Sequence, residues 1–427
     1  MLGIKISRRA RRRRFVPFVA FMAKLLTMDQ TNFDLARARR ETPGCENVLH
    51  FNNAGASLMS QPVLDAVVNH LQLEAAIGGY EAKNRESEAV EHVYDAAARL
   101  INCTPHEIAF IENATRAWDM AFYAIPFNAG DRILTARAEY SSNYIAYLQV
   151  AQRTGAVVEP IPNDEHGQLS VAALRDMIDE RVKLISITHV PTQGGLVNPA
   201  VEVGAVAREA GILYLLDACQ SVGQMPMDVK EIGCDMLSTT GRKYLRGPRG
   251  TGFLYVKGDL IEQLEPPFLD LHAATWVADD RYEIRRDARR FENWEMYYAG
   301  KVGLGVAIDY ALSWDIATTW TRIKTLAEQL RSQLLALGFV TIHDLGIERC
   351  GIVTFNLEEI PADEVQRRLL QMGINVSVSL EESGRLDLAE RKIPQLVRAS
   401  VHYYNSEQEI ERFCDAVTRV FAKRREA

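Results

Sequence analysis

Short apolar runs alternate with helical patterns through the middle of the chain. Seven of these runs have the length and apolar content of buried strands, and segments between them have the spacing of amphipathic helices. This alternation predicts an α/β fold with helices on both faces of a mostly parallel, seven-stranded sheet. The strands are expected at residues 107–111, 132–135, 157–161, 184–188, 212–216, 236–238 and 252–256, and helices at 115–124, 142–154, 171–179 and 199–210.

The pattern changes after residue 305, where a long helical segment precedes a mixture of strands and helices. This change predicts a second, smaller α+β domain at the C-terminal end, as expected for a chain of 427 residues. Its helices are expected at 320–337, 362–372 and 406–419, and its strands at 350–356, 374–380 and 396–402.

The same patterns suggest how the chain divides. We expect a basic, disordered extension over residues 1–28 and an N-terminal segment over 29–60 that packs with the small domain. The large domain then covers residues 61–304 and the small domain 305–427. Within the N-terminal segment, residues 49–58 are expected to cross between the two domains.

Composition excludes some classes of function. Hydrophobic residues make up 47% of the chain and charged residues 25%, as in ordinary soluble proteins. The net charge is −7, and the seven cations within residues 1–14 leave −14 for the remainder, which argues against binding to nucleic acid. The six cysteines form no CxxC pair, so we expect reduced thiols in a cytoplasmic protein, with no disulfide framework and no metal site.

The N-terminus carries a basic run, Arg11 to Arg14, followed by the apolar residues 15–23 and then Lys24. The apolar run is too short to span a membrane. The residues at its end also match a signal-peptide cleavage site poorly. We interpret the segment as an extension, or as a start assigned too early, with Met28 as the natural beginning. Export through a twin-arginine-like signal is the minor alternative.

One short stretch points directly to a chemistry. The apolar run 211–216 ends in Asp217, and Lys243 follows 26 residues later among glycines. A pyridoxal 5′-phosphate (PLP) site requires a lysine for the Schiff base and a carboxylate that keeps the pyridine nitrogen protonated. The neighbouring Arg242 and Arg246 would help to activate the amine. The alternatives are a surface lysine in a basic turn and an aspartate that only caps a turn.

Further residues could complete such a site. Ala114 and Thr115 open a helix after a strand, where a phosphate is favoured, although Thr115 could be only a cap. Tyr140 could stack on the cofactor ring or be a core aromatic, and Gln220 could contact the phenolic oxygen or be a loop residue. Thr192 lies at the carboxyl end of a strand, where ligands gather on such sheets. Thr240 and Arg242 could complete the phosphate cradle.

Arg398 is a charge within the otherwise apolar strand 396–402. A buried charge is costly without a partner, and a bidentate clamp on a substrate carboxylate would explain it. The alternative is an internal salt bridge.

Together these residues resemble the class V aminotransferase family, in the branch that holds cysteine desulfurases, isopenicillin N epimerase-like proteins and carbon–sulfur lyases. The resemblance covers about residues 48–420 and rests on the motifs 217–221, 240–252 and 398–405. It implies the type I PLP-dependent transferase fold and a homodimer with active sites at the subunit interface. It also implies that Asn53 and Ala56 lie near the substrate.

The sequence departs from the desulfurase pattern at three places, and from the wider family at one more. Tyr140 stands where desulfurases have a histidine, Thr240-Gly241-Arg242 replaces Ser-Gly-His, and residues 375–384 lack the nucleophilic cysteine. Residues 290–295 lack the Gly-Thr pair that reaches the neighbouring subunit's phosphate in the family. We therefore expect that the protein is not a persulfide-forming cysteine desulfurase.

The resulting expectation is a PLP-dependent enzyme for an amino acid or amino-acid conjugate. Arg398 would hold the α-carboxylate, and Lys243 would act as general base once the substrate amine displaces it. We expect a carbon–sulfur β-lyase working through a lysine-derived aldimine and a quinonoid, with an aminotransferase or an epimerase as alternatives. The non-enzyme alternative is a catalytically silent PLP-fold binding protein. The expected partners are a small-molecule amino-acid substrate and a second copy of the chain, with no nucleic acid and no membrane.

Overall fold

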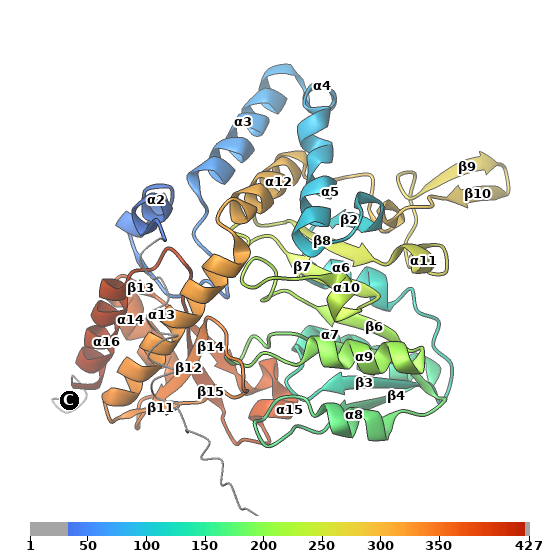
Figure 1. The fold of residues 1–427 in the computed structure, drawn as a ribbon. Coiled ribbons are helices and arrows are strands. Elements are labelled where there is room, and N and C mark those ends of the chain that lie inside the picture. The colour runs from blue at the N-terminus through green and yellow to red at the C-terminus, as the bar shows by residue number, and fades with distance from the viewer. Residues whose placement is uncertain (1–32, 423–427) are drawn as a thin grey trace, which may run out of the picture.

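The computed structural model describes residues 33–422, and a seven-stranded sheet forms its centre (Figure 1). The strands are β2 (Ile108–Ile111), β3 (Arg132–Ala136), β4 (Val157–Ile161), β5 (Val182–Thr188), β6 (Leu213–Asp217), β7 (Met236–Thr240) and β8 (Gly252–Val256). They are ordered β2-β8-β7-β6-β5-β3-β4. β3 to β7 run parallel, and β8 is antiparallel to both of its neighbours. The predicted α/β fold with a mostly parallel sheet is confirmed.

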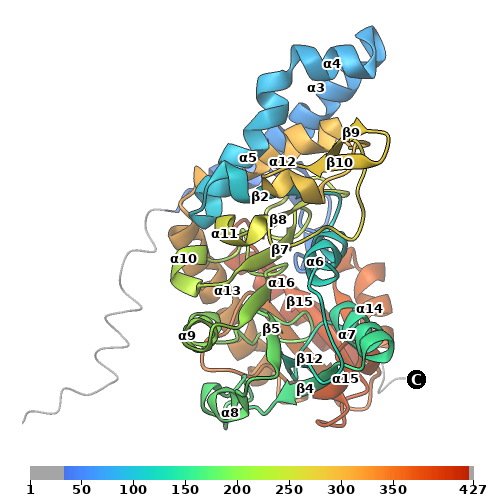
Figure 2. The same cartoon turned by 90° about the vertical axis from the view of Figure 1, so that its right-hand side faces the viewer.

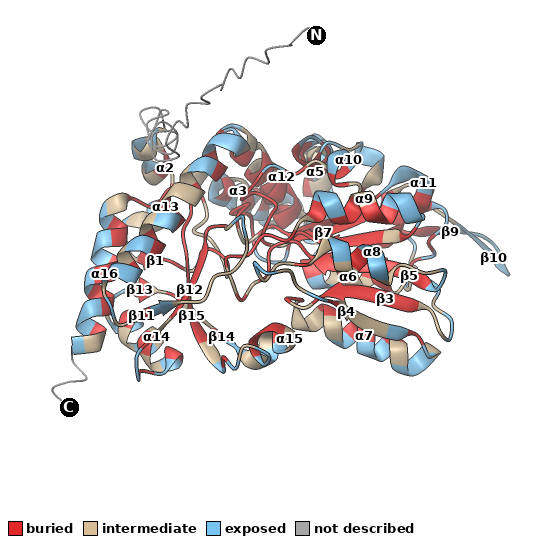
Figure 3. Cartoon of the chain, turned by 60° about the horizontal axis from the view of Figure 1, so that its bottom comes forward, coloured by how far each residue is buried: buried red, intermediate tan, exposed pale blue. Residues whose placement is uncertain are grey.

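Successive residues of the central strands enter two different cores, because side chains alternate across a sheet. In β6, Leu215 packs into one apolar cluster and Leu216 into the other. Helices close both clusters: Figure 2 shows helices on both sides of the sheet, and Figure 3 shows buried strands beside helices with exposed outer faces. One face is covered by α6 (Ala114–Phe122) and α7 (Ser141–Thr154), the other by α5 (Ser87–Ile101), α8 (Val171–Met177), α9 (Ala200–Ala210) and α10 (Val229–Ile232).

Two features of the large unit lie outside the elements expected from the sequence. Helices α3 (Gln61–Ile77) and α4 (Gly79–Arg85) project from the body with α5, and α12 (Tyr298–Leu312) packs against α3 and α5 (Figure 1). The antiparallel hairpin of β9 (Ala274–Ala278) and β10 (Arg281–Ile284) extends away from the sheet. Short helices connect these parts: η3 (Pro105–Glu107), α11 (Gly258–Ile261) and η4 (Ala288–Phe291).

The C-terminal part forms a second unit around a four-stranded antiparallel sheet. Its strands, in spatial order, are β11 (Val340–Ile342), β12 (Ile352–Leu357), β15 (Gln395–Ser400) and β14 (Ser377–Leu380). Its helices are α13 (Ile316–Ala336), α14 (Ala362–Gln371), α15 (Arg385–Leu388) and α16 (Glu407–Ala422), with η5 (Glu381–Ser383).

The N-terminal segment is built into this second unit. β1 (Leu49–His50) pairs in parallel with β13 (Ile374–Asn375). The strand expected over 374–380 is therefore split, since β13 takes β1 as its partner while β14 pairs with β15. Before β1 come α2 (Leu35–Arg40) and η2 (Pro43–Glu46), and Arg39 forms an ion pair of 2.8 Å with Glu409 of α16.

Helix α12 runs through residue 304, where the sequence suggested a boundary, and packs on the large unit. We propose that the boundary lies near Ser313, where this helix ends. The extension expected over residues 1–28, with its twin-arginine alternative, lies outside the described residues. Within residues 33–422, no helix combines the length and apolar character needed to cross a bilayer.

Candidate active site

A cavity opens at the carboxyl ends of β5, β6 and β7. Parallel strands bring the residues that follow them to one edge of the sheet, which is where ligands bind in such folds. The lining residues are Asn113, Ala114, Thr115, Tyr140, Thr188, Val190, Thr192, Asp217, Cys219, Gln220, Thr240, Arg242 and Lys243. All nine residues that the sequence suggested for cofactor binding are in this set.

Lys243 lies three residues beyond the end of β7 and is partly buried in the cavity wall. Burial lowers the pKa of its amine, and the charges of Arg242 and Arg398 act in the same direction. Asp217 and Cys219 oppose this shift. A lysine with a lowered pKa has more of the neutral amine that attacks a carbonyl group.

Asp217 is the last residue of β6 and is almost fully buried. Its Oδ1 accepts a hydrogen bond of 3.0 Å from the backbone N–H of Cys219, and its Oδ2 accepts one of 3.0 Å from Asn143 Nδ2. The carboxylate is thereby held in one orientation beside the cavity. Such a fixed anion can form an ion pair with a protonated ring nitrogen.

The N-terminus of α6 supplies an anion-binding end. Asn113 caps the helix by accepting a hydrogen bond of 2.9 Å from the N–H of Arg116, and Thr115 is exposed in the first turn. The free N–H groups and the dipole of a helix N-terminus favour a phosphate. Arg242 lines the same cavity and is held by a bond from Nη1 to the Gly55 carbonyl.

Tyr140 and Gln220 line two further walls of the cavity. The backbone N–H of Tyr140 donates to Glu139 Oε1 at 2.8 Å, which fixes the start of α7. Gln220 Nε2 donates to the Ala54 carbonyl at 3.0 Å and to Thr192 Oγ1 at 3.3 Å. Its Oε1 is buried without a partner in the described part of the chain, so a bound ligand could satisfy it.

Arg398 lies in β15 between Thr354 of β12 and Ser377 of β14. Its Nη1 donates to Thr192 Oγ1 at 2.5 Å and to the Thr192 carbonyl at 3.1 Å. Nη2 makes a 3.4 Å contact with Asn52 Oδ1, and the buried Nε has no partner among residues 33–422.

Burial lowers the pKa of Arg398 to about 10. The alternative explanation for this charge was an internal salt bridge. Within the described residues, however, Arg398 forms no ion pair with a carboxylate. Two of its nitrogens are therefore available to a carboxylate ligand.

Asn53, Ala56 and Arg398 are not among the residues that line the cavity, although Arg398 bonds Thr192, which does line it. Asn53 is fully buried, where its Nδ2 donates to the Ser400 carbonyl at 2.7 Å and its Oδ1 accepts from the Tyr404 hydroxyl. The carbonyl of Ala56 contacts His50 Nε2 at 2.9 Å. In this segment Asn52 and Ala54 make the contacts to Arg398 and Gln220.

Sequence reasoning did not single out Cys219, which lines the cavity, or Glu139 and Asn143, which lie behind it. Burial raises the pKa of the Cys219 thiol, and Asp217 acts in the same direction. A signal for the other two was present in the sequence. Glu139 and Asn143 are polar residues four positions apart at a predicted strand-to-helix junction.

The cavity combines an amine, a fixed carboxylate, a helix N-terminus with a guanidinium group, and an unsatisfied amide oxygen. These groups fit PLP, which presents an aldehyde, a pyridine nitrogen, a phosphate and a phenolic oxygen. The fold and the site thus define a PLP-dependent enzyme with the type I fold.

The Aminotransferase class-V family matches residues 49–413, and the chain belongs to this family. A probable cysteine desulfurase of Methanothermobacter thermautotrophicus is 28% identical over 87% of this chain and 94% of its own length. The apo structure of a cysteine desulfurase from Thermococcus onnurineus superposes with a TM-score of 0.84 at 25% identity, covering 90% and 97% of the two chains.

A complex of the cystine C–S lyase C-DES with cysteine persulfide has a TM-score of 0.80 at 23% identity, covering 88% of this chain and 98% of that one. At this identity the likeness shows the fold alone. Another structure of C-DES contains glycine covalently linked to the PLP cofactor. The cofactor expected from the sequence, PLP, is confirmed by the family.

The expectation that the protein is not a cysteine-persulfide desulfurase is wrong. Relatives aligned over most of both chains are named cysteine desulfurases. The exclusion gave most weight to the missing cysteine in residues 375–384, which fold as the end of β13, β14 and η5. A few absent side chains do not outweigh likeness along most of the chain to proteins named cysteine desulfurases.

Proposed function

We propose that this PLP-dependent enzyme breaks a carbon–sulfur bond of cysteine or of a cysteine-derived amino acid. The observation that carries the proposal is a cavity lined by Lys243 and Asp217, with Arg398 bonded to Thr192 of the same lining. It provides a cofactor amine, a ring-nitrogen partner and, beside them, a guanidinium group whose Nε has no partner in the described chain. The names of the curated relatives support sulfur chemistry.

Each residue would have a defined task. Bound PLP supplies an electron-accepting ring that stabilises negative charge at the substrate Cα. Lys243 would hold the cofactor covalently and, when released, remove the Cα proton. Asp217 would keep the ring nitrogen protonated, and Tyr140 would pack against the ring.

Two groups would bind the anions. Arg398 would hold the α-carboxylate through Nε and Nη2, the nitrogens that Thr192 leaves free. At the opposite end, the N-terminus of α6 with Thr115 and Arg242 would hold the phosphate.

Two products are possible for the carbon skeleton. If sulfur is transferred to a thiol, the skeleton leaves as alanine; if a β-sulfur group is eliminated, it leaves as pyruvate and ammonia. Of the six cysteines, Cys219 lines the cavity, and burial keeps its thiol protonated. An external thiol must therefore be included in any assay, because the thiolate is the form that accepts sulfur.

The deciding experiment incubates the purified holoenzyme with L-cysteine or L-cystine, with and without dithiothreitol. Sulfide, alanine and pyruvate are quantified, and a 2-oxo acid is added in a parallel reaction. Release of sulfide with alanine or pyruvate is the expected result. If no sulfide forms with either substrate and a new amino acid forms from the 2-oxo acid, the proposal is wrong and the enzyme is an aminotransferase.

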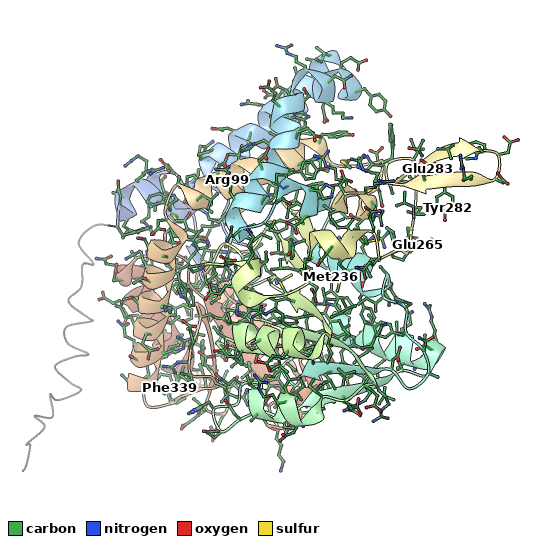
Figure 4. The ribbon with its side chains drawn as sticks, turned by 45° about the vertical axis from the view of Figure 1, so that its right-hand side comes forward. Arg99, Met236, Glu265, Tyr282, Glu283 and Phe339 are labelled. Atoms are coloured by element: carbon green, nitrogen blue, oxygen red, sulfur yellow. The ribbon has the colours of Figure 1, made fainter. Side chains whose placement is uncertain are left out.

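We also propose a homodimer. Large apolar side chains are exposed on the hairpin and on the segment that leads to it; Trp276 is 77% exposed and Leu271 is 70% exposed. Figure 4 shows Tyr282 and Glu283 on this hairpin, away from the body of the subunit. Surfaces of this kind mark interaction sites, and a second copy would cover them.

A further inference from the structure

Two buried carboxylates, Asp217 in the cavity lining and Glu139 behind it, share one amide group. Asn143 Nδ2 donates to Asp217 Oδ2 at 3.0 Å and to Glu139 Oε1 at 2.9 Å. All three side chains are almost fully buried, with Glu139 at 3% exposure and Asn143 at 2%. An amide NH2 has two hydrogens, so each carboxylate receives one and the Asn143 side chain is fixed in a single orientation.

Glu139 is held by donors from three elements. Its Oε1 also accepts from the N–H of Tyr140 at 2.8 Å and from the Thr188 hydroxyl. Its Oε2 accepts from Thr135 Oγ1 at 2.9 Å and from the N–H of Thr188 at 3.2 Å. The carboxylate thus ties the ends of β3 and β5 to the start of α7, around the point where Asp217 and Tyr140 meet the cavity.

We propose that Glu139 is a positioning residue of the cofactor site, which acts through Asn143 to aim Asp217 at the ring nitrogen of PLP and through the backbone to place Tyr140. This inference rests on the proposed roles of Asp217 and Tyr140. Glu139 itself does not line the cavity and touches no reacting atom.

The electrostatics of the cluster agree with this role. Burial raises the pKa of Glu139 to about 7, Asp217 acts in the same direction, and the donors Thr188, Asn143 and Tyr140 act against it. The titratable groups that face Glu139 are Asp217 and the buried Tyr147. Without its five donors the carboxylate would be much harder to keep at this depth, since a buried charge needs such partners.

The test compares Glu139→Gln, Asn143→Ala and the double variant as holoenzymes. Ser186→Ala is the matched control, because it removes a buried hydroxyl of β5 that bonds Tyr147 and not Glu139. Three quantities are measured: the dissociation constant for PLP, the pH midpoint of the visible absorption band of the bound cofactor, and kcat and KM for C–S cleavage.

We expect each single variant to weaken PLP binding by roughly tenfold or more, as occurs when groups supporting a ligand's direct contacts are lost at metal sites. The pH midpoint of the band should move upward. When Asp217 no longer keeps the ring nitrogen protonated, the ring withdraws less electron density from the nitrogen that joins it to the lysine, and that nitrogen becomes more basic. kcat should fall while KM stays nearly unchanged, since Arg398 is untouched. The double variant should bind PLP no more weakly than the more impaired of the two single variants. Ser186→Ala should behave as wild type.

The proposal is overturned if Glu139→Gln folds and keeps the wild-type PLP affinity and band midpoint. It is also overturned if the losses of the two single variants multiply in the double variant. Should Glu139→Gln fail to fold, Asn143→Ala alone decides by the same two spectroscopic readouts. PLP affinity and the band need no substrate, so failure of the C–S cleavage assay would leave this test intact.

Discussion

Arg398 offers the sharpest test of substrate recognition. Thr192 occupies its Nη1, while Nε and Nη2 face no strong acceptor in the described chain. These two nitrogens can bind both oxygens of a substrate carboxylate.

The magnitude follows from that geometry. A hydrogen bond to a charged group contributes about 1.5–3 kcal/mol, so losing two costs about 3–6 kcal/mol. Arg398→Ala should therefore lower kcat/KM for L-cysteine by about 10²- to 10⁴-fold. Arg398→Lys keeps one point charge and should lose roughly half of this free energy.

The assay compares two substrates, L-cysteine and cysteamine, which lacks the carboxylate. Wild type should prefer cysteine strongly, and Arg398→Ala should treat the two almost alike. Arg391→Lys is the control, because this half-buried arginine donates to the His343 carbonyl and pairs with Asp387, whereas Arg398 bonds Thr192 of the cavity lining. If Arg398→Ala loses as much activity on cysteamine as on cysteine, the carboxylate-clamp assignment is refuted.

Three other outcomes are expected. Borohydride reduction followed by peptide mass spectrometry should attach the cofactor to Lys243 in wild type and leave no adduct in Lys243→Ala; an adduct on another lysine would contradict the site. Burial raises the pKa of Glu139 to about 7, so the folded state holds its proton more tightly than the unfolded state does. Its contribution to the free energy of unfolding is therefore present at low pH and declines between about pH 4.5 and 7. Urea unfolding should show wild type losing stability relative to Glu139→Gln across that window, and parallel curves would argue against the raised pKa. Replacing Trp276 and Leu271 by serine should convert the proposed dimer to monomer in light scattering, and an unchanged mass would place the interface elsewhere.

The main fold could be predicted because its signals are local. Each strand of the large sheet is a short apolar run between helical patterns, and all seven were found within a few residues. The cofactor cavity followed because the lining residues come directly after those strands, where sheet geometry brings them together.

Other features depend on contacts between distant parts of the chain. The hairpin of β9 and β10 carries exposed aromatics and little alternation with a core face, so periodicity gave no signal. The split between β13 and β14 depends on β1, which lies far away in sequence. Glu139 looked like an ordinary polar residue beside Tyr140, and its five donors became visible only when three elements were assembled.

The pairing of β1 with β13 has a consequence for biosynthesis. About 325 residues separate Leu49 from Ile374, so at about 5–20 residues per second the first strand waits roughly 16–65 s for its partner. Meanwhile the guanidinium of Arg246, which in the finished protein donates to Thr42 and Tyr403, lacks its C-terminal partner. The nascent chain must therefore keep β1 without its sheet partner until most of the protein has been synthesised.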